Sequence, residues 1–210
     1  MIKLEKTSVM NFENALRGAR NPMNSWDRMD SKFNADGIWL GPNDLALARK
    51  LLNAGSDHRK FIRQIFVSVD ITAPLYWWKE FDTYKVGTVA NSCSTMHKIH
   101  AKEFTLDDFS IEHLDMLSTD TMFLHIIPIL NINRDLFIEK KDKKYWWQMI
   151  QLLPSSYNQL RTVTLNYENL LNQYHARKHH KLDEWRTYCD WIETLPYFKE
   201  ICLGGDTDGK

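Results

Sequence analysis

Two residues of one predicted helix carry side chains that suit a nucleotide. Asn166 and Arg177 lie eleven residues apart, about three helical turns, so both side chains project from one face. Arginine is preferred for a phosphate or a carbonyl edge because its planar fork binds both bidentately. The spacing therefore indicates one polar pocket. A surface arginine that is favourably placed against the dipole at a helix end is the alternative.

A polar loop precedes this helix in the sequence and offers hydroxyl groups. Ser92, Ser94 and Thr95 lie in a stretch, residues 84–97, that has neither helical nor strand periodicity. Such a loop can present hydroxyls and backbone N–H groups to a phosphate. An ordinary turn is the alternative. At the start of the loop, Lys85 offers a point charge and Tyr84 a ring for stacking, although an amphipathic residue at a helix end explains Tyr84 equally well.

Other reactive residues do not form a site. His175 and His179 are spaced i, i+4 and His180 follows, but no acid or cysteine completes a metal-ligand set. We therefore predict a solvated basic helix end and no metal. No partner for Cys93 as a nucleophile can be assigned. The paired tryptophans are expected in the core and at interfaces rather than in a cofactor site: Trp77, Trp78, Trp146 and Trp147.

The elements around the loop have clear local signals. Asn43 is a good N-cap for a helix that ends at Gly55. Over residues 65–71, aliphatic side chains alternate with Phe66, Ser68 and Asp70, which predicts a strand with one buried face. Thr72-Ala73-Pro74 then opens a helix, because proline is tolerated in the first turn.

The rest of the chain is predicted to be mostly helical. The exceptions are residues 1–42, which predict a strand or two with irregular connections, and the tail 204–210, which is expected to be disordered. The order indicates an α+β fold: one domain, residues 1–203, with a central antiparallel or mixed sheet and flanking helices. The expected elements are a helix from Thr105 toward Leu117, a helix over about 120–138 interrupted or bent at Pro128, a helix over 145–153, a strand over 162–165, a helix capped by Asn166, and a last helix that Pro196 closes.

The composition excludes several classes of protein. Lys plus Arg and Asp plus Glu number 27 each, so no global positive field holds a nucleic acid or an anionic membrane. Three cysteines without a CxxC pair argue against a disulfide framework and a structural zinc site. No run is long enough to span a membrane and nothing marks the chain for export, so we expect a cytoplasmic protein.

Two segments resemble one enzyme family. FVSVDITAPLYWWKEFDTYK, Phe66 to Lys85, resembles without a gap the strand, the Ala-Pro helix and the basic tripeptide of the flavin-dependent thymidylate synthases. LPSSYNQLRTVTLNYENLLNQYHAR, Leu153 to Arg177, resembles the stretch of that family that ends at a substrate-binding arginine. Between them, residues 86–97 resemble the loop that ends in Ser-x-Arg-Tyr. The resemblance covers about residues 43–195.

The resemblance implies site residues. It matches Arg177 to the arginine that holds the developing charge of the pyrimidine, and Ser94 to the loop serine at the phosphate, so these two would be catalytic. Ser94 is preferred over Cys93, because the same one-residue shift places Asn91 on the asparagine of the loop. The remaining substrate contacts would be Glu80, Asn91, Ser92 and Arg161, and the flavin contacts would be Thr83, Tyr84, Lys85, Asn166 and Asn172.

The chain departs from the family at several of these positions. Thr83-Tyr84-Lys85 stands where the family has Arg-His-Arg, and Met96 stands at the arginine near the end of the loop. Arg161 matches a phosphate-binding arginine, which reaches in from a neighbouring subunit, only if the alignment slips by one from Leu160. These changes affect flavin binding more than the fold.

The activity implied is methylation of dUMP to dTMP with FAD, methylenetetrahydrofolate and NADPH, in a homotetramer with sites between subunits. Two alternatives stay open. One is an enzyme of the same fold that modifies another pyrimidine nucleotide with altered or lost flavin use. The other is a nucleotide-binding protein without catalysis.

Overall fold

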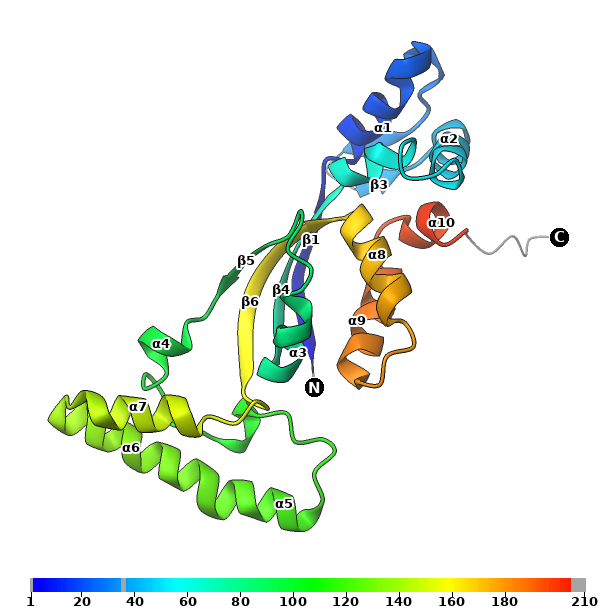
Figure 1. Cartoon of the computed structure of the whole chain (residues 1–210). Coiled ribbons are helices and arrows are strands. Elements are labelled where there is room, and N and C mark those ends of the chain that lie inside the picture. Colours follow the sequence, from blue (N-terminus) through cyan, green and yellow to red (C-terminus); the bar gives the residue numbers. More distant parts are fainter. Residues whose placement is uncertain (1, 35–36, 205–210) are drawn as a thin grey trace. The chain divides into compact units, whose positions relative to one another are not determined.

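A computed structural model describes residues 2–34 and 37–204 of the chain (Figure 1). These residues group into two compact units. The first unit contains residues 2–3, 70–83 and 90–162, and the second contains 4–34, 37–69, 84–89 and 163–204. The tail that we predicted to be disordered lies, from residue 205 on, outside the described residues.

The main sheet has the strand order β1-β4-β6-β5. Thr162 Oγ1 donates a hydrogen bond to Asp70 Oδ1 at 2.6 Å, and Thr164 pairs with Ser68 through their hydroxyls at 3.3 Å. The residue number rises along β6 as it falls along β4, so these strands are antiparallel. The predicted α+β class with an antiparallel sheet is confirmed. The strands are β1 (Lys3–Met10), β4 (Phe66–Pro74), β5 (Val89–Ser92) and β6 (Asn158–Asn166).

Strand β4 and the helix after it follow the predicted pattern. The alternate residues Val67, Val69, Ile71 and Ala73 of β4 are all buried. Pro74 is the N-cap of α3 (Leu75–Phe81), so the Ala-Pro step does start a helix. The α3 side chains form an aromatic cluster, in which the Trp77 ring stacks on Phe81 at 5.0 Å and meets Trp78 edge-on at 4.9 Å.

Helices dominate the rest of the first unit. Helices α6 and α7 lie side by side (Figure 1) over an apolar cluster that includes Phe104, Phe109, Leu130 and Met149. The predicted irregularity near Pro128 is confirmed as a π-helical turn directly before α6. The elements are α4 (Thr95–Lys98), the 3₁₀ turn η4 (Leu106–Asp108), α5 (Met116–Thr121), the π turn η5 (Met122–Ile126), α6 (Ile127–Lys140) and α7 (Lys143–Leu152).

The predicted helix from Thr105 toward Leu117 is wrong. Thr105 and Asp108 form the expected capping box, but only one 3₁₀ turn follows. Phe109 instead forms an antiparallel bridge with Tyr157, and the Ser110 amide donates to the carbonyl of Ser156 at 2.8 Å. Strand pairing therefore takes over from the helix. The next helix, α5, begins only at the Asp115 cap.

The second unit contains two helices that the sequence did not predict. Helix α1 begins after Asn11, a left-handed residue whose side chain caps nothing, so no capping signal announces it. Helix α10 follows Pro196, so α9 is not the last helix as predicted. The elements are α1 (Phe12–Arg20), the 3₁₀ turns η1 (Asn21–Met23), η2 (Trp26–Arg28) and η3 (Arg59–Gln64), the hairpin strands β2 (Lys32–Asn34) and β3 (Gly37–Trp39), α2 (Pro42–Asn53), α8 (Tyr167–Arg177), α9 (Asp183–Glu193) and α10 (Phe198–Cys202).

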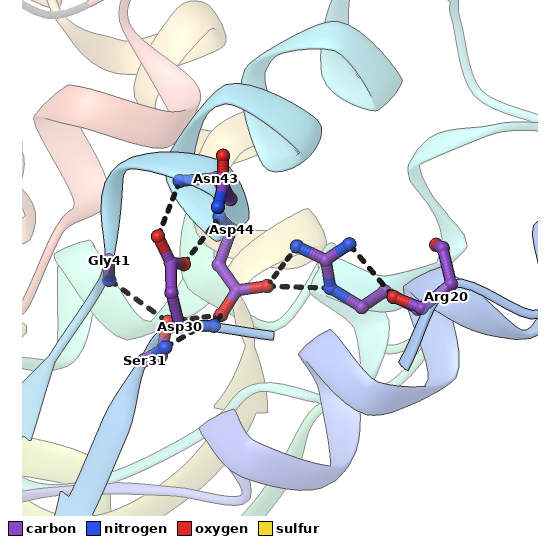
Figure 2. A network of polar contacts seen from close by, with 7 residues as sticks. Arg20, Asp30, Ser31, Gly41, Asn43 and Asp44 are labelled. Atoms are coloured by element: carbon purple, nitrogen blue, oxygen red, sulfur yellow. Dashed lines mark hydrogen bonds and ion pairs between the residues drawn. The ribbon is translucent and has the colours of Figure 1, made fainter. Parts of the chain in front are cut away.

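The carboxylates of Asp30 and Asp44 form a hydrogen-bond network at the first turn of α2 (Figure 2). The Asp30 carboxylate accepts the backbone N–H groups of Asn43 and Asp44 at 2.9 and 3.0 Å, so Asp30, and not Asn43 as predicted, caps the helix. Asp44 is fully buried and accepts two bonds from the Arg20 guanidinium, at 2.6 and 2.7 Å. It also accepts the hydroxyl and the N–H of Ser31. The irregular segment before α2 is thereby fixed to α1.

The cysteines Cys93, Cys189 and Cys202 are free thiols. No helix among the described residues is long and apolar enough to cross a membrane.

Candidate functional site

Arg177, the predicted substrate-binding arginine, ends α8 and is held by two aromatic side chains of the second unit. Its Nε donates a hydrogen bond to the hydroxyl oxygen of Tyr84 at 2.8 Å. Its guanidinium carbon lies 4.7 Å from the ring centroid of Trp185 and 5.6 Å from that of Tyr84. Attraction between a guanidinium and an aromatic face stabilises this placement. The cation at the end of α8 therefore has a fixed orientation.

The aromatic residues Trp185 and Tyr188 form a buried, uncharged wall that contacts this arginine through Trp185. The rings of Trp185 and Tyr188 are fully buried and meet edge-on at 5.6 Å. The Tyr188 hydroxyl donates to Gln173 Oε1 at 2.7 Å. Burial raises the pKa of Tyr188 well above its ordinary value, so the hydroxyl stays protonated at neutral pH and remains a donor. The wall thus positions Arg177 without adding a competing charge.

Asn169 attaches the segment 84–89 to the start of α8. Its Nδ2 donates to the carbonyl oxygen of Val86 at 2.8 Å. Gly87 has φ +72°, and a Cβ added there would lie 3.0 Å from Asn169 Oδ1. Asn169 was not among the predicted site residues. Its signal was an Asn three residues after the N-cap, the spacing of a capping box.

The two predicted flavin contacts on α8 differ in what they do. Asn166 accepts the Asn169 N–H through Oδ1 at 3.0 Å and receives the reciprocal cap at 3.2 Å, so it caps the helix. Asn172 is exposed. It precedes Arg177 by five residues and therefore points about 140° away from it around the helix. Asn166 precedes α8 with an extended backbone, φ −125° and ψ 170°, so the common helical face of Asn166 and Arg177 stays a prediction.

Arg161 forms its own cluster in the first unit. Its guanidinium lies 4.2 Å from the Trp78 ring centroid. Nη1 pairs with Asp82 at 2.7 Å, and Nε donates to Gln159 Oε1 at 3.0 Å. The side chain is 15% exposed. The arginine is thus oriented by three neighbours of its own unit.

The remaining predicted residues of the first unit lie on β5, at the start of α4 and at the end of α3. Ser94 caps α4, accepting the His97 N–H at 3.3 Å, while Asn91 and Ser92 are exposed on β5. Cys93 is tied into the sheet, because its N–H donates to the Leu160 carbonyl at 2.9 Å. Its own carbonyl accepts a bond from Gln159. At the end of α3, the Thr83 hydroxyl donates to the backbone carbonyl of Glu80 at 2.7 Å.

The structure therefore brings the predicted residues together in two groups. In the second unit, Tyr84 and Arg177 are in contact, and Lys85 is exposed beside Tyr84 in the sequence. In the first unit, Glu80 and Thr83 are in contact, and Arg161 has a separate cluster. The structure describes no group of three or more His, Cys, Asp or Glu side chains that could hold a metal ion, and this covers His175, His179 and His180.

Two solved structures are similar to this chain over nearly its whole length. One is thymidylate synthase X of Helicobacter pylori with FAD and dUMP: the TM-score is 0.69, 14% of residues are identical, and the match covers 97% of this chain and 98% of that one. The other is the flavin-dependent thymidylate synthase of the same organism with the same two ligands, with a TM-score of 0.67, 15% identity and the same coverage. This chain has their fold. No family model and no curated protein sequence matches it.

The residues around Tyr84 fit a flavin nucleotide, with a reduced set of cations. A pyrophosphate requires positive charge and N–H donors, and Lys85 supplies one exposed ammonium where the family has guanidinium groups. Tyr84 contributes a ring beside Arg177, whereas Asn172 is exposed on another side of α8. The fixed guanidinium of Arg177 fits a pyrimidine carbonyl or a phosphate more closely.

Proposed function

We propose that this protein methylates dUMP to dTMP, with methylenetetrahydrofolate as the one-carbon donor and NADPH as the reductant. The C5 hydrogen of the uracil ring leaves as a proton, the one-carbon unit takes its place, and a hydride that derives from NADPH reduces that unit to a methyl group. FAD, when bound, supplies the redox chemistry and carries the one-carbon unit. The protein's own residues bind and polarise the nucleotide.

One observation carries this proposal: the full-length likeness to two enzymes solved with FAD and dUMP coincides with an oriented arginine at the matched position. Arg177 is held by Tyr84 and Trp185, two side chains of the protein itself. A preorganised cation stabilises charge that develops in a transition state without further reorganisation. In this proposal, Arg177 faces the pyrimidine carbonyl and stabilises the negative charge of the ring.

The loop and strand residues are assigned to the phosphate and the flavin. Ser94, Ser92 and Asn91 donate to the phosphate of dUMP, with Arg161 as its cation and Glu80 at the nucleotide. Thr83, Tyr84, Lys85, Asn166 and Asn172 contact FAD, with Lys85 as the one charge at its pyrophosphate. These ten assignments, like that of Arg177, follow the resemblance in sequence.

We further propose a homotetramer of this single-domain chain. Large apolar side chains of α5, η5 and α6 are exposed in the first unit, among them Met116 at 82%, Leu117 at 76% and Ile132 at 53%. Exposed large apolar side chains in such numbers favour an interaction site. A second copy of the chain would cover it.

The absorption spectrum of the freshly purified protein, followed by tritium release from dUMP labelled at C5, tests the activity. We expect flavin bands near those of free FAD and tritium release that requires NADPH and methylenetetrahydrofolate. Arg177→Lys is the informative variant, because it keeps the charge and removes the planar fork. Protein that neither carries nor takes up FAD and releases no tritium would not have this activity.

A second candidate function follows from Thr83-Tyr84-Lys85, which replaces two of the three basic side chains of the family motif. In this alternative the protein binds or modifies a pyrimidine nucleotide without flavin. Thermal-shift measurements with dUMP, dCMP, FAD and folates separate the two: stabilisation by a nucleotide and not by FAD would favour the alternative.

A further inference from the structure

A polar concavity of about 760 Å³ lies beside α1 in the second unit, and it shares no lining residue with the Arg177 cluster. One wall is a face of α1 that continues into η1, because Asn14, Arg17 and Gly18 of α1 and Asn21 of η1 recur at helical spacing. Its seven lining residues contain no carboxylate and one cation. They are Asn11, Asn14, Arg17, Gly18, Asn21, Trp26 and Gln64.

Hydrogen bonds fix the side chains of this wall. Asn14 Nδ2 donates to Asn11 Oδ1 at 2.6 Å, and Arg17 donates to Asn14 Oδ1 at 2.8 Å. Asn11 in turn donates to the backbone carbonyl of Gln64 at 2.9 Å. Asn11 has φ +72°, a left-handed conformation that few residues except glycine and asparagine adopt readily. Bonds within the protein therefore orient this row of amides.

Trp26 presents a fixed aromatic surface at the same concavity. Half of the residue is exposed, although a free-standing tryptophan ring gains by burial. Its indole N–H donates to Asn21 Oδ1 at 2.9 Å, which restricts the ring to one orientation. A ring that is both exposed and restricted is a stacking platform.

Hydrogen-bonding capacity remains at this wall. Within residues 2–34 and 37–204, the side-chain amide of Gln64 and the amide nitrogen of Asn21 hydrogen-bond to no protein group. Gly18 stands between them in α1, where glycine is less favourable than alanine by about 1 kcal/mol. A Cβ there would lie 3.3 Å from Gln64 Oε1. Glycine at this position keeps the Gln64 amide close to the helix.

We propose that this concavity binds the base of a purine nucleoside or nucleotide. The base stacks on Trp26, while its edge pairs with amide groups, which match the adjacent donor and acceptor of adenine, or with Arg17, which matches the two acceptors of guanine. Base–aromatic stacking contributes about as much as one good bidentate pair. Arg17 gives the lining a positive charge that no lining carboxylate balances, which favours a neutral or anionic ligand. The site is independent of dUMP methylation and of the residues assigned to it.

Calorimetric titration of the purified full-length chain with adenosine, guanosine, AMP and uridine tests the proposal. We expect a purine nucleoside to bind and uridine to bind at least about tenfold more weakly, because the smaller ring loses stacking area. If AMP binds more tightly than adenosine, the natural ligand is a nucleotide and Arg17 contacts its phosphate. Equal affinity would assign it to the nucleoside base alone.

Matched variants locate the site. Trp26→Ala should weaken purine binding about tenfold or more. Trp39→Ala is the control, since Trp39 has the same 50% exposure but does not line the concavity. Asn14→Ala should weaken binding while leaving the thermal unfolding midpoint close to that of the unaltered chain. Saturating dUMP should leave purine affinity unchanged, which keeps this test separate from the proposed activity.

Three results would overturn the proposal. One is no heat of binding for any purine at millimolar concentration. Another is an equal effect of the two tryptophan variants. The last is displacement of the purine by glucose at similar concentration, since that would indicate a carbohydrate site.

Discussion

The Nε of Arg177 donates to the Tyr84 hydroxyl at 2.8 Å, joining two residues that are 93 positions apart in the chain. Tyr84 stands where the family has the histidine of its Arg-His-Arg motif, so a departure in sequence becomes a support for the matched arginine. The second support, Trp185, comes from α9. The orientation of this cation therefore depends on three segments of the second unit, and each support can be removed singly.

Tyr84→Phe should weaken dUMP binding while the fold persists. The substitution keeps the ring at Arg177 and removes one hydrogen bond to a charged group, which contributes about 1.5–3 kcal/mol. Some of this loss is recovered by water, so we expect about a tenfold higher Kd by calorimetry. Tyr145→Phe, on α7 in the first unit, is the matched control and should leave the Kd unchanged. An unchanged Kd in Tyr84→Phe would show that Arg177 does not need this bond.

Lys85 should determine flavin occupancy. If its ammonium is the one charge at the pyrophosphate, Lys85→Ala should lower the FAD content of the purified protein severalfold, and Lys85→Arg should preserve or raise it because a fork replaces a point charge. The ratio of flavin absorbance to protein absorbance measures this. Lys79→Ala, an exposed lysine of α3, serves as the control. Equal flavin content in all variants would remove Lys85 from the cofactor site.

The sequence predicted those elements whose signals are local. The alternation in β4, the Ala-Pro start of α3 and the Asn166 cap of α8 are each encoded within a few residues, and all three are confirmed. The start of α2 was misassigned because its cap, Asp30, lies thirteen residues before Asn43. Similarly, the helix expected after Thr105 gives way to pairing of Phe109 with the distant Tyr157. Contacts of this kind have no periodic signal.

The candidate site likewise contains residues with local sequence signals and residues whose roles depend on tertiary packing. The cap at Asn166 could be predicted from the residues next to it, and its geometry confirms that role. The capping-box spacing also marks Asn169 as a cap of α8. Its bond to the segment 84–89 and the contact of Trp185 with Arg177 could not be predicted, because they arise only when α8, α9 and that segment pack together.

Gly87→Ala should cost stability and disturb the site. An alanine at positive φ is strained by about 1–2 kcal/mol, and its Cβ would also lie 3.0 Å from Asn169 Oδ1. Gly55→Ala is the control, since Gly55 also has positive φ but nothing lies within 4 Å of its Cβ position. We expect Gly87→Ala to lose more free energy of unfolding in urea than Gly55→Ala does, and to weaken dUMP binding. Equal losses would mean that Asn169 simply moves aside.

The Asp44 network should make the fold sensitive to acid. Burial raises the pKa of Asp44, but the bonds from Ser31, from Arg20 and from the backbone together outweigh burial and hold it below the ordinary value of 3.8. The folded-state pKa is therefore lower than the unfolded one, so the stabilisation is fully present above about pH 4 and is lost as pH falls through the folded-state pKa. Asp44→Asn should lose about 3–5 kcal/mol at pH 7, because it leaves Arg20 buried and unpaired. Urea unfolding at pH 7 and pH 3 measures both, and the gap between the two proteins should shrink at pH 3. A constant gap would mean that packing, and not the charge, carries the effect.

The exposed apolar side chains of α5 to α6 should control assembly. Leu117 and Ile132 are 76% and 53% exposed, and a glutamate in place of either would put an unpaired charge into an interface that is otherwise apolar. Light scattering coupled to gel filtration should therefore give a tetramer for the unaltered chain and a smaller species for Ile132→Glu. Met23→Glu, at an 81% exposed residue of the second unit, controls for added charge and should leave the mass unchanged. If the sites lie between subunits, Ile132→Glu should also lose tritium release from dUMP although it alters none of the assigned residues. A monomeric unaltered chain, or a full-size Ile132→Glu assembly, would contradict the proposed role of this surface.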